Sequence, residues 1–208
     1  MCSSDLPGEL DSIYSMDYEH AVHPASACHG HVRAIDTIRN SVTTHRGCYG
    51  GCSFCAVHAM QGRDVVSRSP ESIVAEVGRI ASAEGFDGVL RDVGGPTANM
   101  YGTGCAVGGC EGGRCLFPEP CENLRLDHSP SMALLGAVRG CEGVRKAFVA
   151  SGVRHDMVLA DGAHGEAYLR DLCEHHVSGQ MKVAPEHVSK RVLDPMGKPG
   201  KEALTAFK

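Results

Sequence analysis

Stretches with helical periodicity alternate with short runs of β-branched and apolar residues along residues 37–208. The apolar runs predict strands at residues 38–44, 88–93, 147–151 and 180–184. Between them, apolar residues spaced three and four apart predict helices that begin near Pro70, Pro130 and Gly165. Such alternation is typical of an α/β fold with parallel strands.

The first of these helices has the clearest start signals. Ser69 is expected as its N-cap, Pro70 at its first position and Glu71 near the positive end of its dipole. Ser129 precedes Pro130 in the same way and is expected to cap the second helix. The apolar face of the first helix would be formed by Ile73, Val74, Val77, Ile80 and Ala81.

The positions of proline and glycine divide the chain into two parts. Residues 1–36 contain Pro7, Gly8, Pro24 and Gly30 and are predicted to be irregular, whereas residues 37–208 form the core. Residues 2–6 can be back-translated into a sequencing-adapter string, so we interpret residues 1–6 as an artefact and give Cys2 no role; an ordinary disordered N-terminus is the alternative. After a turn at residues 196–200 the chain ends in a helix start, so we expect the core to be incomplete at its C-terminus.

The amino-acid composition argues against several classes of protein. The formal net charge is −5 and aromatic residues make up 5% of the chain, which argues against a general nucleic-acid binder, although a local RNA site stays open. No apolar run approaches the about 20 residues of a membrane span, and no signal peptide is visible. We therefore expect a cytoplasmic location without a membrane partner.

The chain has 11 cysteines, and their clustered spacing favours metal binding over disulfides. Cys48, Cys52 and Cys55 form a Cys-x3-Cys-x2-Cys loop (residues 48–55, the cysteine loop) directly after the first strand. Thiolates suit iron–sulfur clusters, and three of them leave one iron of a four-iron cluster without a protein ligand. The alternative is zinc bound by these three cysteines and His58.

A second set of thiols follows the second strand. Cys105, Cys110, Cys115 and Cys121 (the second cysteine group) lie within one glycine-rich stretch and can close around a metal. Both an auxiliary iron–sulfur cluster and a structural zinc ion fit this pattern. The alternative is a set of free thiols or a substrate-binding loop.

The cysteine spacing, with Phe54 before the third cysteine, resembles the radical SAM superfamily. Longer strings, in the same order along residues 38–200, resemble the YgiQ-type radical SAM proteins. These strings are residues 45–56, 61–63, 67–69, 94–101, 150–154 and 184–187.

The resemblance implies a partial (β/α) barrel of the radical SAM type, truncated here to about four βα units. It implies that Cys48, Cys52 and Cys55 ligate a [4Fe–4S] cluster whose open iron binds S-adenosyl-L-methionine. One electron from a flavodoxin- or ferredoxin-like donor would then cleave the cofactor to a 5′-deoxyadenosyl radical, which abstracts hydrogen from an unknown substrate. A zinc-binding interaction module and an inactive gene fragment are the alternatives, and no catalytic residue is predicted.

The resemblance also suggests cofactor-binding residues at the ends of later strands. Residues 94–97 (the glycine loop) stand where the superfamily has a Gly-Gly-Glu-like motif, but Pro96 replaces the usual Glu, so only the backbone role carries over. A plain tight turn and ordinary structural polar residues are the alternatives. The candidates are Gly94, Gly95, Pro96, Thr97, Ser151, Arg154 and Glu186.

Overall fold

The computed structural model describes residues 6–108, 110 and 114–208. Residues 1–5, including Cys2, lie outside the described residues, and with them most of the segment that we interpret as an artefact. Within the described ranges the chain is a mixed α/β structure with small sheets that do not close into a barrel.

Parallel strands form the centre of the structure. Strand β1 (Ser41–Thr43) pairs in parallel with β5 (Asp92–Gly94), and β4 (Val89–Leu90) pairs in parallel with β8 (Lys146–Ala147). Arg91 alone separates β4 from β5, and its backbone N–H donates to Asn40 O (2.9 Å). The parallel pairs therefore join the first predicted strand to the second, and the second to the third, as the alternating pattern predicts.

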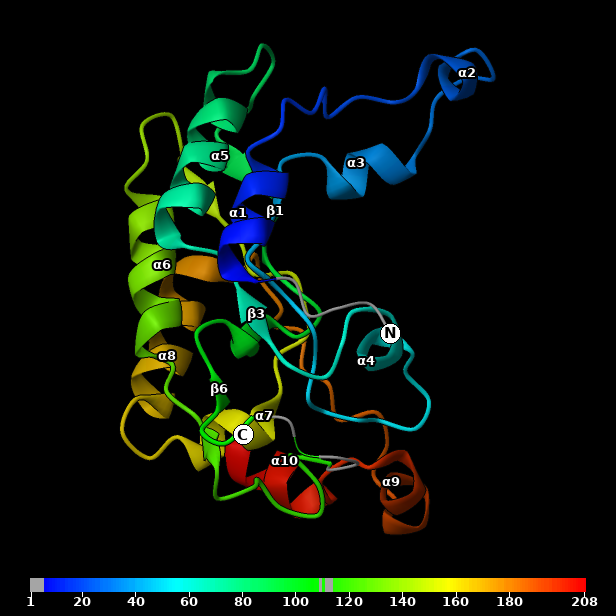
Figure 1. Cartoon of the computed structure of the whole chain (residues 1–208), viewed down its shortest axis with the longest axis vertical. Coiled ribbons are helices and arrows are strands. Elements are labelled where there is room, and N and C mark those ends of the chain that lie inside the picture. The colour runs from blue at the N-terminus through cyan, green and yellow to red at the C-terminus, as the bar shows by residue number, and fades with distance from the viewer. Residues whose placement is uncertain (1–5, 109, 111–113) are drawn as a thin grey trace.

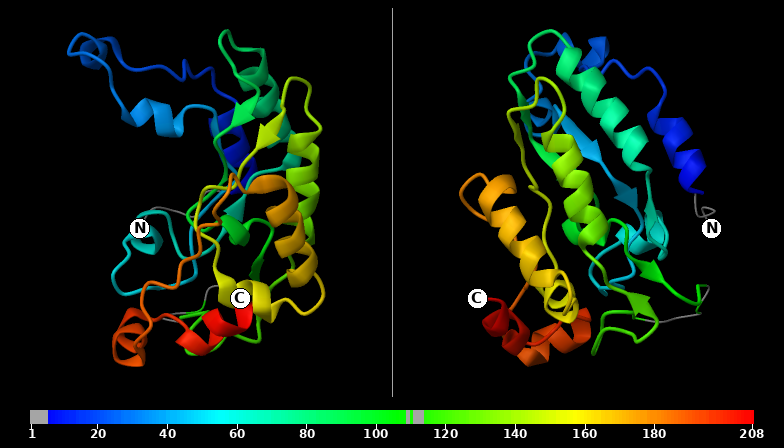
Figure 2. Two further views of the ribbon diagram at one scale, coloured as in Figure 1. Left: turned by 180° about the vertical axis from the view of Figure 1, so that it is seen from behind. Right: turned by 90° about the vertical axis from the view of Figure 1, so that its left-hand side faces the viewer.

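Three helices cover one side of these strands and lie side by side (Figures 1 and 2): α5 (Pro70–Ser82), α6 (Ser129–Arg139) and α8 (Gly165–Asp171), which continues into the π-helix η2 (Leu172–His176). The predicted cap of α5 is confirmed, since Ser69 Oγ accepts from Ser72 N (3.2 Å). The predicted cap of α6 is wrong. The helix begins one residue earlier than expected, so Ser129 is its first helical residue and His128 occupies the N-cap position without a side-chain cap bond; Asp127 Oδ1 accepts from Ser129 N (2.8 Å).

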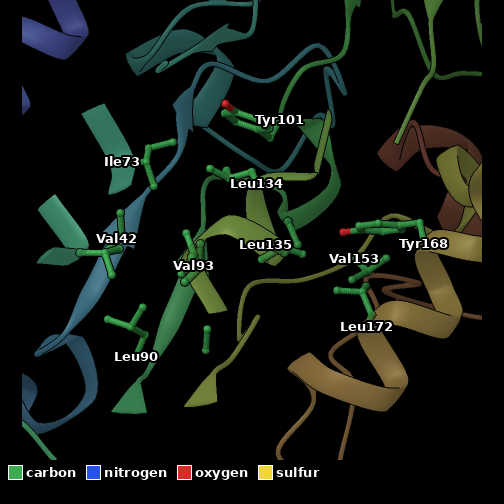
Figure 3. Packing of buried hydrophobic residues seen from close by; sticks show 14 of the residues in the cluster. Val42, Ile73, Leu90, Val93, Tyr101, Leu134, Leu135, Val153, Tyr168 and Leu172 are labelled. Atoms are coloured by element: carbon green, nitrogen blue, oxygen red, sulfur yellow. The ribbon is translucent and has the colours of Figure 1, made fainter. Parts of the chain in front are cut away.

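The hydrophobic core lies between the strands and these helices (Figure 3). Val42, Leu90 and Val93 of the strands are each at most 3% exposed. They pack against the apolar faces of the helices, as the periodicity of α5 and α6 predicts. The main helical members are Ile73, Val77, Leu134, Leu135, Val138, Tyr168 and Leu172.

The prediction that residues 7–36 are irregular is wrong. They contain α1 (Pro7–Tyr14), α2 (Pro24–Ala27) and, overlapping the expected first strand, α3 (Ala34–Ile38). The two prolines that were interpreted as breakers stand at first helical positions, where the missing N–H costs nothing. Leu10 anchors α1 beside α5 and is fully buried, whereas α2 and α3 project from the body (Figure 1).

The expected strand at residues 180–184 is also not formed. Only Val183 makes a bridge, in parallel with Val153. The pattern missed the helices α7 (His155–Ala160) and α9 (Lys190–Met196), while α10 (Lys201–Phe207) matches the expected helix start. No helix in the described ranges combines the length and apolar composition that spanning a bilayer requires.

Short elements complete the described structure. They are β2 (His45–Arg46), which pairs antiparallel with β3 (Val66–Ser67), β6 (Gly104–Cys105), which pairs antiparallel with β7 (Leu124–Arg125), helix α4 (Val57–Met60) and the 3-10 helix η1 (Ala98–Met100).

Candidate metal centre

The cysteine loop lies in the segment that joins β2 to β3, two strands that pair with each other just beyond the end of β1. Its base is closed by a backbone hydrogen bond from Cys48 N to Gly62 O (3.2 Å). Gly47 has a φ of 85°, and a Cβ there would lie 1.9 Å from Asp64 O, so only glycine fits. The local sequence thus forces the chain to turn immediately before the first thiol.

Two of the three thiols meet at Gly50. A Cβ on Gly50 would lie 3.3 Å from Cys48 Sγ and 3.7 Å from Cys52 Sγ, so the missing side chain leaves a space that both sulfurs border. The Gly50 N–H donates to Cys48 Sγ (3.4 Å). Cys55 follows in the same turn through a bond from Cys55 N to Cys52 O (3.1 Å) and is half-buried.

The donor set fits a polynuclear cluster better than a single zinc ion. Zinc–sulfur bonds of about 2.3 Å in a tetrahedron bring the sulfurs within about 3.8 Å of one another. Among the described residues, three ligand atoms lie mutually within 4.8 Å only at Asp127, Asp161 and His164. The three thiols and His58 therefore do not converge on one point. In a cluster each thiolate binds a different iron and wider spacing is expected.

The Asp127, Asp161 and His164 group is itself accounted for by hydrogen bonds within the chain. Asp161 Oδ1 accepts from the N–H groups of Ala163 and His164, and its Oδ2 accepts from His128. Asp127 Oδ1 pairs with His164 Nδ1 (3.0 Å). The two carboxylates therefore already serve as acceptors for backbone N–H groups and imidazole nitrogens.

Arg154 places a buried cation against the cysteine loop. It is 3% exposed, and its Nη1 lies 3.6 Å from Cys52 Sγ. Its Nε donates to Asp156 Oδ1 (3.0 Å), and its Nη2 donates to Asp156 Oδ2. Burial disfavours the charged form, but the hydrogen bonds and charge of Asp156 hold the pKa of Arg154 above its usual range. Arg154 thus already binds a carboxylate of its own chain.

A cavity of about 450 Å³ lies at the carboxyl ends of β1 and β5. Four of the predicted cofactor residues line it together: Gly94, Gly95, Pro96 and Ser151. Val57 and Gln61, which follow the third thiol, line it as well, whereas none of the three cysteines is in the lining. Ser151, at the end of the strand predicted at residues 147–151, donates its hydroxyl to Asp92 Oδ2 (2.6 Å). This bond connects that end to β5.

The other predicted cofactor residues lie nearby but not in this lining. Thr97 is buried, with its Oγ1 3.8 Å from Cys48 Sγ. Glu186, at a φ of 64°, pairs with Lys198 Nζ (3.0 Å). Lys198 is 3% exposed, and its Nζ lies 5.9 Å from the centre of the Phe54 ring, so this ion pair lies next to the cysteine loop.

Sequence reasoning missed the support that holds these residues. Asn99 Oδ1 accepts from Arg154 N (2.9 Å), and its Nδ2 donates to Arg154 O (3.0 Å) and to His128 Nε2 (3.1 Å). His128 Nδ1 in turn donates to Asp161 Oδ2 (2.7 Å). Asn99 lies inside one of the resembling strings, but His128 and Asp161 carried no local signal.

His45 was missed as well, although it is the first residue of the resembling string at residues 45–56. Its ring is fully buried beneath Gly95, where a Cβ would lie 2.5 Å from His45 Cε1. Nδ1 donates to Thr44 Oγ1 (2.9 Å), which itself donates to Gly94 O. Burial lowers the pKa of His45 to about 4, against the opposing effect of the Thr97 carbonyl, so the ring is neutral at pH 7.

The end of α9 also contacts the cysteine loop. Ser53 N donates to Met196 O (3.1 Å), and Ser53 Oγ donates to Pro195 O (2.7 Å). These bonds join residues far apart in the sequence, so no local pattern could predict them.

Comparison with known proteins identifies close relatives. No family model matches the sequence. The chain is 49% identical over 203 residues to a UPF0313 protein of Fusobacterium nucleatum, covering 96% of this chain and 36% of the relative. It is 46% identical to a UPF0313 protein of Methanocella arvoryzae and 42% identical to one of Clostridium botulinum, covering 33% and 32% of those relatives. The chain thus spans about a third of the length of the curated relatives it matches.

Proposed function

We propose that this chain is a radical SAM core in which Cys48, Cys52 and Cys55 ligate a [4Fe–4S] cluster and S-adenosyl-L-methionine occupies the adjoining cavity. One observation carries the proposal: the two loops that follow the paired parallel strands β1 and β5 meet, with Cys48 Sγ 3.8 Å from Thr97 Oγ1, beside a cavity of about 450 Å³. When bound, the cluster supplies the electron that cleaves the cofactor to methionine and a 5′-deoxyadenosyl radical.

The glycine loop would position the cofactor through its backbone. Gly95 rests directly on the His45 ring, which leaves no room for a side chain and keeps the loop close to the cavity. Thr44 N donates to Gly94 O (2.7 Å), which fixes the start of this loop against the end of β1. Pro96 offers a carbonyl acceptor but no carboxylate, so the amino group of the cofactor would be bound by backbone oxygen.

Arg154 and Gly50 would tune the thiolates. Both donate N–H groups to sulfur, Arg154 to Cys52 and Gly50 to Cys48. Hydrogen bonds to cluster sulfurs and nearby positive charge are among the means by which a protein sets a reduction potential. Arg154 and Gly50 would therefore act on the metal site.

The arrangement of the strands supports a partial (β/α) barrel of the radical SAM type. Parallel pairings follow chain order from β1 to β5, from β4 to β8 and on to the Val153–Val183 bridge, with helices between them. The motif strings add the finer resemblance to the YgiQ-type proteins. The substrate is unassigned, and the electron donor would be a flavodoxin- or ferredoxin-like protein.

The test is anaerobic reconstitution followed by EPR spectroscopy. We expect the reduced protein to show a cluster signal that changes when S-adenosyl-L-methionine is added, because the cofactor binds the open iron. Cys52→Ala should abolish the response to the cofactor, whereas Cys173→Ala, which removes an exposed thiol, should retain it. A signal that is indifferent to the cofactor would contradict the proposal.

A further inference from the structure

The second cysteine group is brought together by a small antiparallel pair of strands. Cys105 in β6 stands opposite Leu124 of β7, and Ala106 N donates to Asn123 O (2.8 Å). Cys121 begins the turn into β7 and donates its N–H to Cys115 O (2.8 Å). Two backbone connections therefore hold Cys105, Cys115 and Cys121 in one place.

The fourth thiol joins them by a contact with Cys105. The Cys110 thiol donates to the Cys105 sulfur, and the backbone N–H groups of Val107 and Gly108 point at the same sulfur. Cys105, Cys110 and Cys115 line one cavity, and Cys121 packs with Cys115 against the same apolar cluster. Backbone N–H groups directed at a sulfur are the typical environment of a metal-bound thiolate.

The thiols border a space instead of converging on a point. A cavity of about 300 Å³ is lined by Cys105, Cys110 and Cys115, together with Tyr49 and Gly51 of the cysteine loop. In the described part of the chain no three of these sulfurs lie mutually within 4.8 Å. A tetrahedral zinc ion would need sulfurs at about 3.8 Å from one another, whereas a cluster places its own iron and sulfide between them.

One apolar cluster connects this cavity with the cysteine loop. Tyr49, Met100 and Leu124 are buried in it, and the half-buried thiols of Cys48, Cys115 and Cys121 pack against it. The Tyr49 phenol is hydrogen-bonded to Thr103 Oγ1, and Cys48 and Cys115 pack against the cluster that contains Tyr49. The two cysteine groups thus pack against one apolar cluster, while Cys110 of the second group is exposed.

From this geometry we infer that Cys105, Cys110, Cys115 and Cys121 bind a second iron–sulfur cluster, separated from the first site by Tyr49. The inference goes beyond the proposed function and does not depend on it, since none of these four residues belongs to the first site. Four thiolates complete the coordination of such a cluster, so it would have no open iron and would bind no cofactor.

The experiment isolates the second site by removing the first. A variant with Cys48→Ala, Cys52→Ala and Cys55→Ala is reconstituted anaerobically with iron and sulfide, and bound iron, zinc and acid-labile sulfide are counted. We expect iron and sulfide in equal amounts, at least two of each per chain. Adding Cys105→Ala and Cys121→Ala should remove them, whereas adding Cys28→Ala and Cys173→Ala, at exposed thiols, should not.

Two results would overturn the inference: zinc without sulfide in the triple variant, or a triple variant with a wild-type circular dichroism spectrum that holds no iron. If the triple variant does not fold, the reverse comparison decides. With the first site intact, replacing the four cysteines of the second group by Ala should remove part of the wild-type iron, and unchanged iron content would contradict the inference. Sulfide retained in the triple variant would support the second site even if the wild-type chain failed to cleave S-adenosyl-L-methionine.

Discussion

At the residue scale, the cysteine loop rests on buried groups whose protonation and shape are fixed by their surroundings. His45 fills the space beneath Gly95 as a neutral ring, and Arg154 brings a permanent charge to Cys52. The motif spacing alone predicted the three thiols. It could not predict these supports, because their burial depends on segments that are distant in sequence.

The neutral state of His45 predicts a pH-dependent stability. Its pKa is about 4 in the folded chain and about 6.5 in an unfolded one, so the unfolded state binds more protons between these values. Stability contributed by this group is present above pH 6.5 and is lost as the pH falls toward 4, by about 3 kcal/mol. Urea denaturation at pH 7 and pH 4.5 measures the loss.

His45→Gln is the matched comparison, because glutamine stays neutral over this range. The variant should lose less stability than the wild type on acidification, while the other histidines contribute equally to both chains. An identical loss in the two chains would show that His45 does not titrate in this way.

Gly50 is predicted to be essential for loading the metal site. Ala at this position would place a methyl group 3.0 Å from Arg154 Nη1 and 3.3 Å from Cys48 Sγ, in the space that both sulfurs border. We expect Gly50→Ala to lower bound iron several-fold, as measured by iron counting after anaerobic reconstitution. Gly162→Ala, where a Cβ meets nothing within 4 Å, is the control and should load normally. If both variants bound equal amounts of iron, this prediction would be wrong.

At the scale of secondary-structure elements, the sequence predicted an element correctly where the capping and packing signals lie in that element's own residues. Helix α5 has its cap and its proline where predicted, and Ile73, Val77 and Ile80 of its predicted apolar face are buried. Val74 and Ala81 are only half-buried, and Glu76 is buried in addition. Residues 180–184 have the apolar composition of a strand but make only one bridge, since pairing depends on neighbours that a local pattern does not specify. The same limit explains why residues 7–36 were misjudged: Pro7 can begin a helix or break one, and the packing of Leu10 decides.

The cap of α5 provides a quantitative test at this scale. Ser69→Ala removes the acceptor for Ser72 N and should destabilise the chain by about 1 kcal/mol. Ser82→Ala, near the exposed end of the same helix, removes only a bond to Gly78 O and should change stability by less than about 0.5 kcal/mol. Urea denaturation of both variants compares them directly, and equal effects would mean that Ser69 is not acting as a cap.

At the scale of the whole molecule, polar contacts join segments that the sequence separates widely. The network from Asp161 through His128 and Asn99 holds the backbone at Arg154, so four segments meet at the wall of the candidate site. Aspartate, histidine and asparagine in scattered positions gave no pattern to detect. The cysteines, in contrast, were detectable because they stand at a recognisable spacing in one short loop.

Removing the carboxylate of Asp161 is predicted to affect both stability and metal loading. Asp161→Ala would leave the buried N–H donors of His128 unpaired, at a cost of about 3 kcal/mol. Because Arg154 would lose its fixed backbone, bound iron should fall as well. Asp194→Ala, which removes a surface pair with Lys190, should change neither quantity appreciably. If the Asp161→Ala chain were destabilised but held as much iron as the wild type, the hydrogen-bond network would not support the metal site.

The most direct test of the central claim is the formation of 5′-deoxyadenosine. The anaerobically reconstituted chain is mixed with S-adenosyl-L-methionine and dithionite, and the products are separated and quantified by mass spectrometry. We expect 5′-deoxyadenosine and methionine from the wild type and no product above background from Cys48→Ala. If a wild-type chain loaded with a four-iron cluster formed no 5′-deoxyadenosine, or if Cys48→Ala formed as much as the wild type, the proposed function would be contradicted.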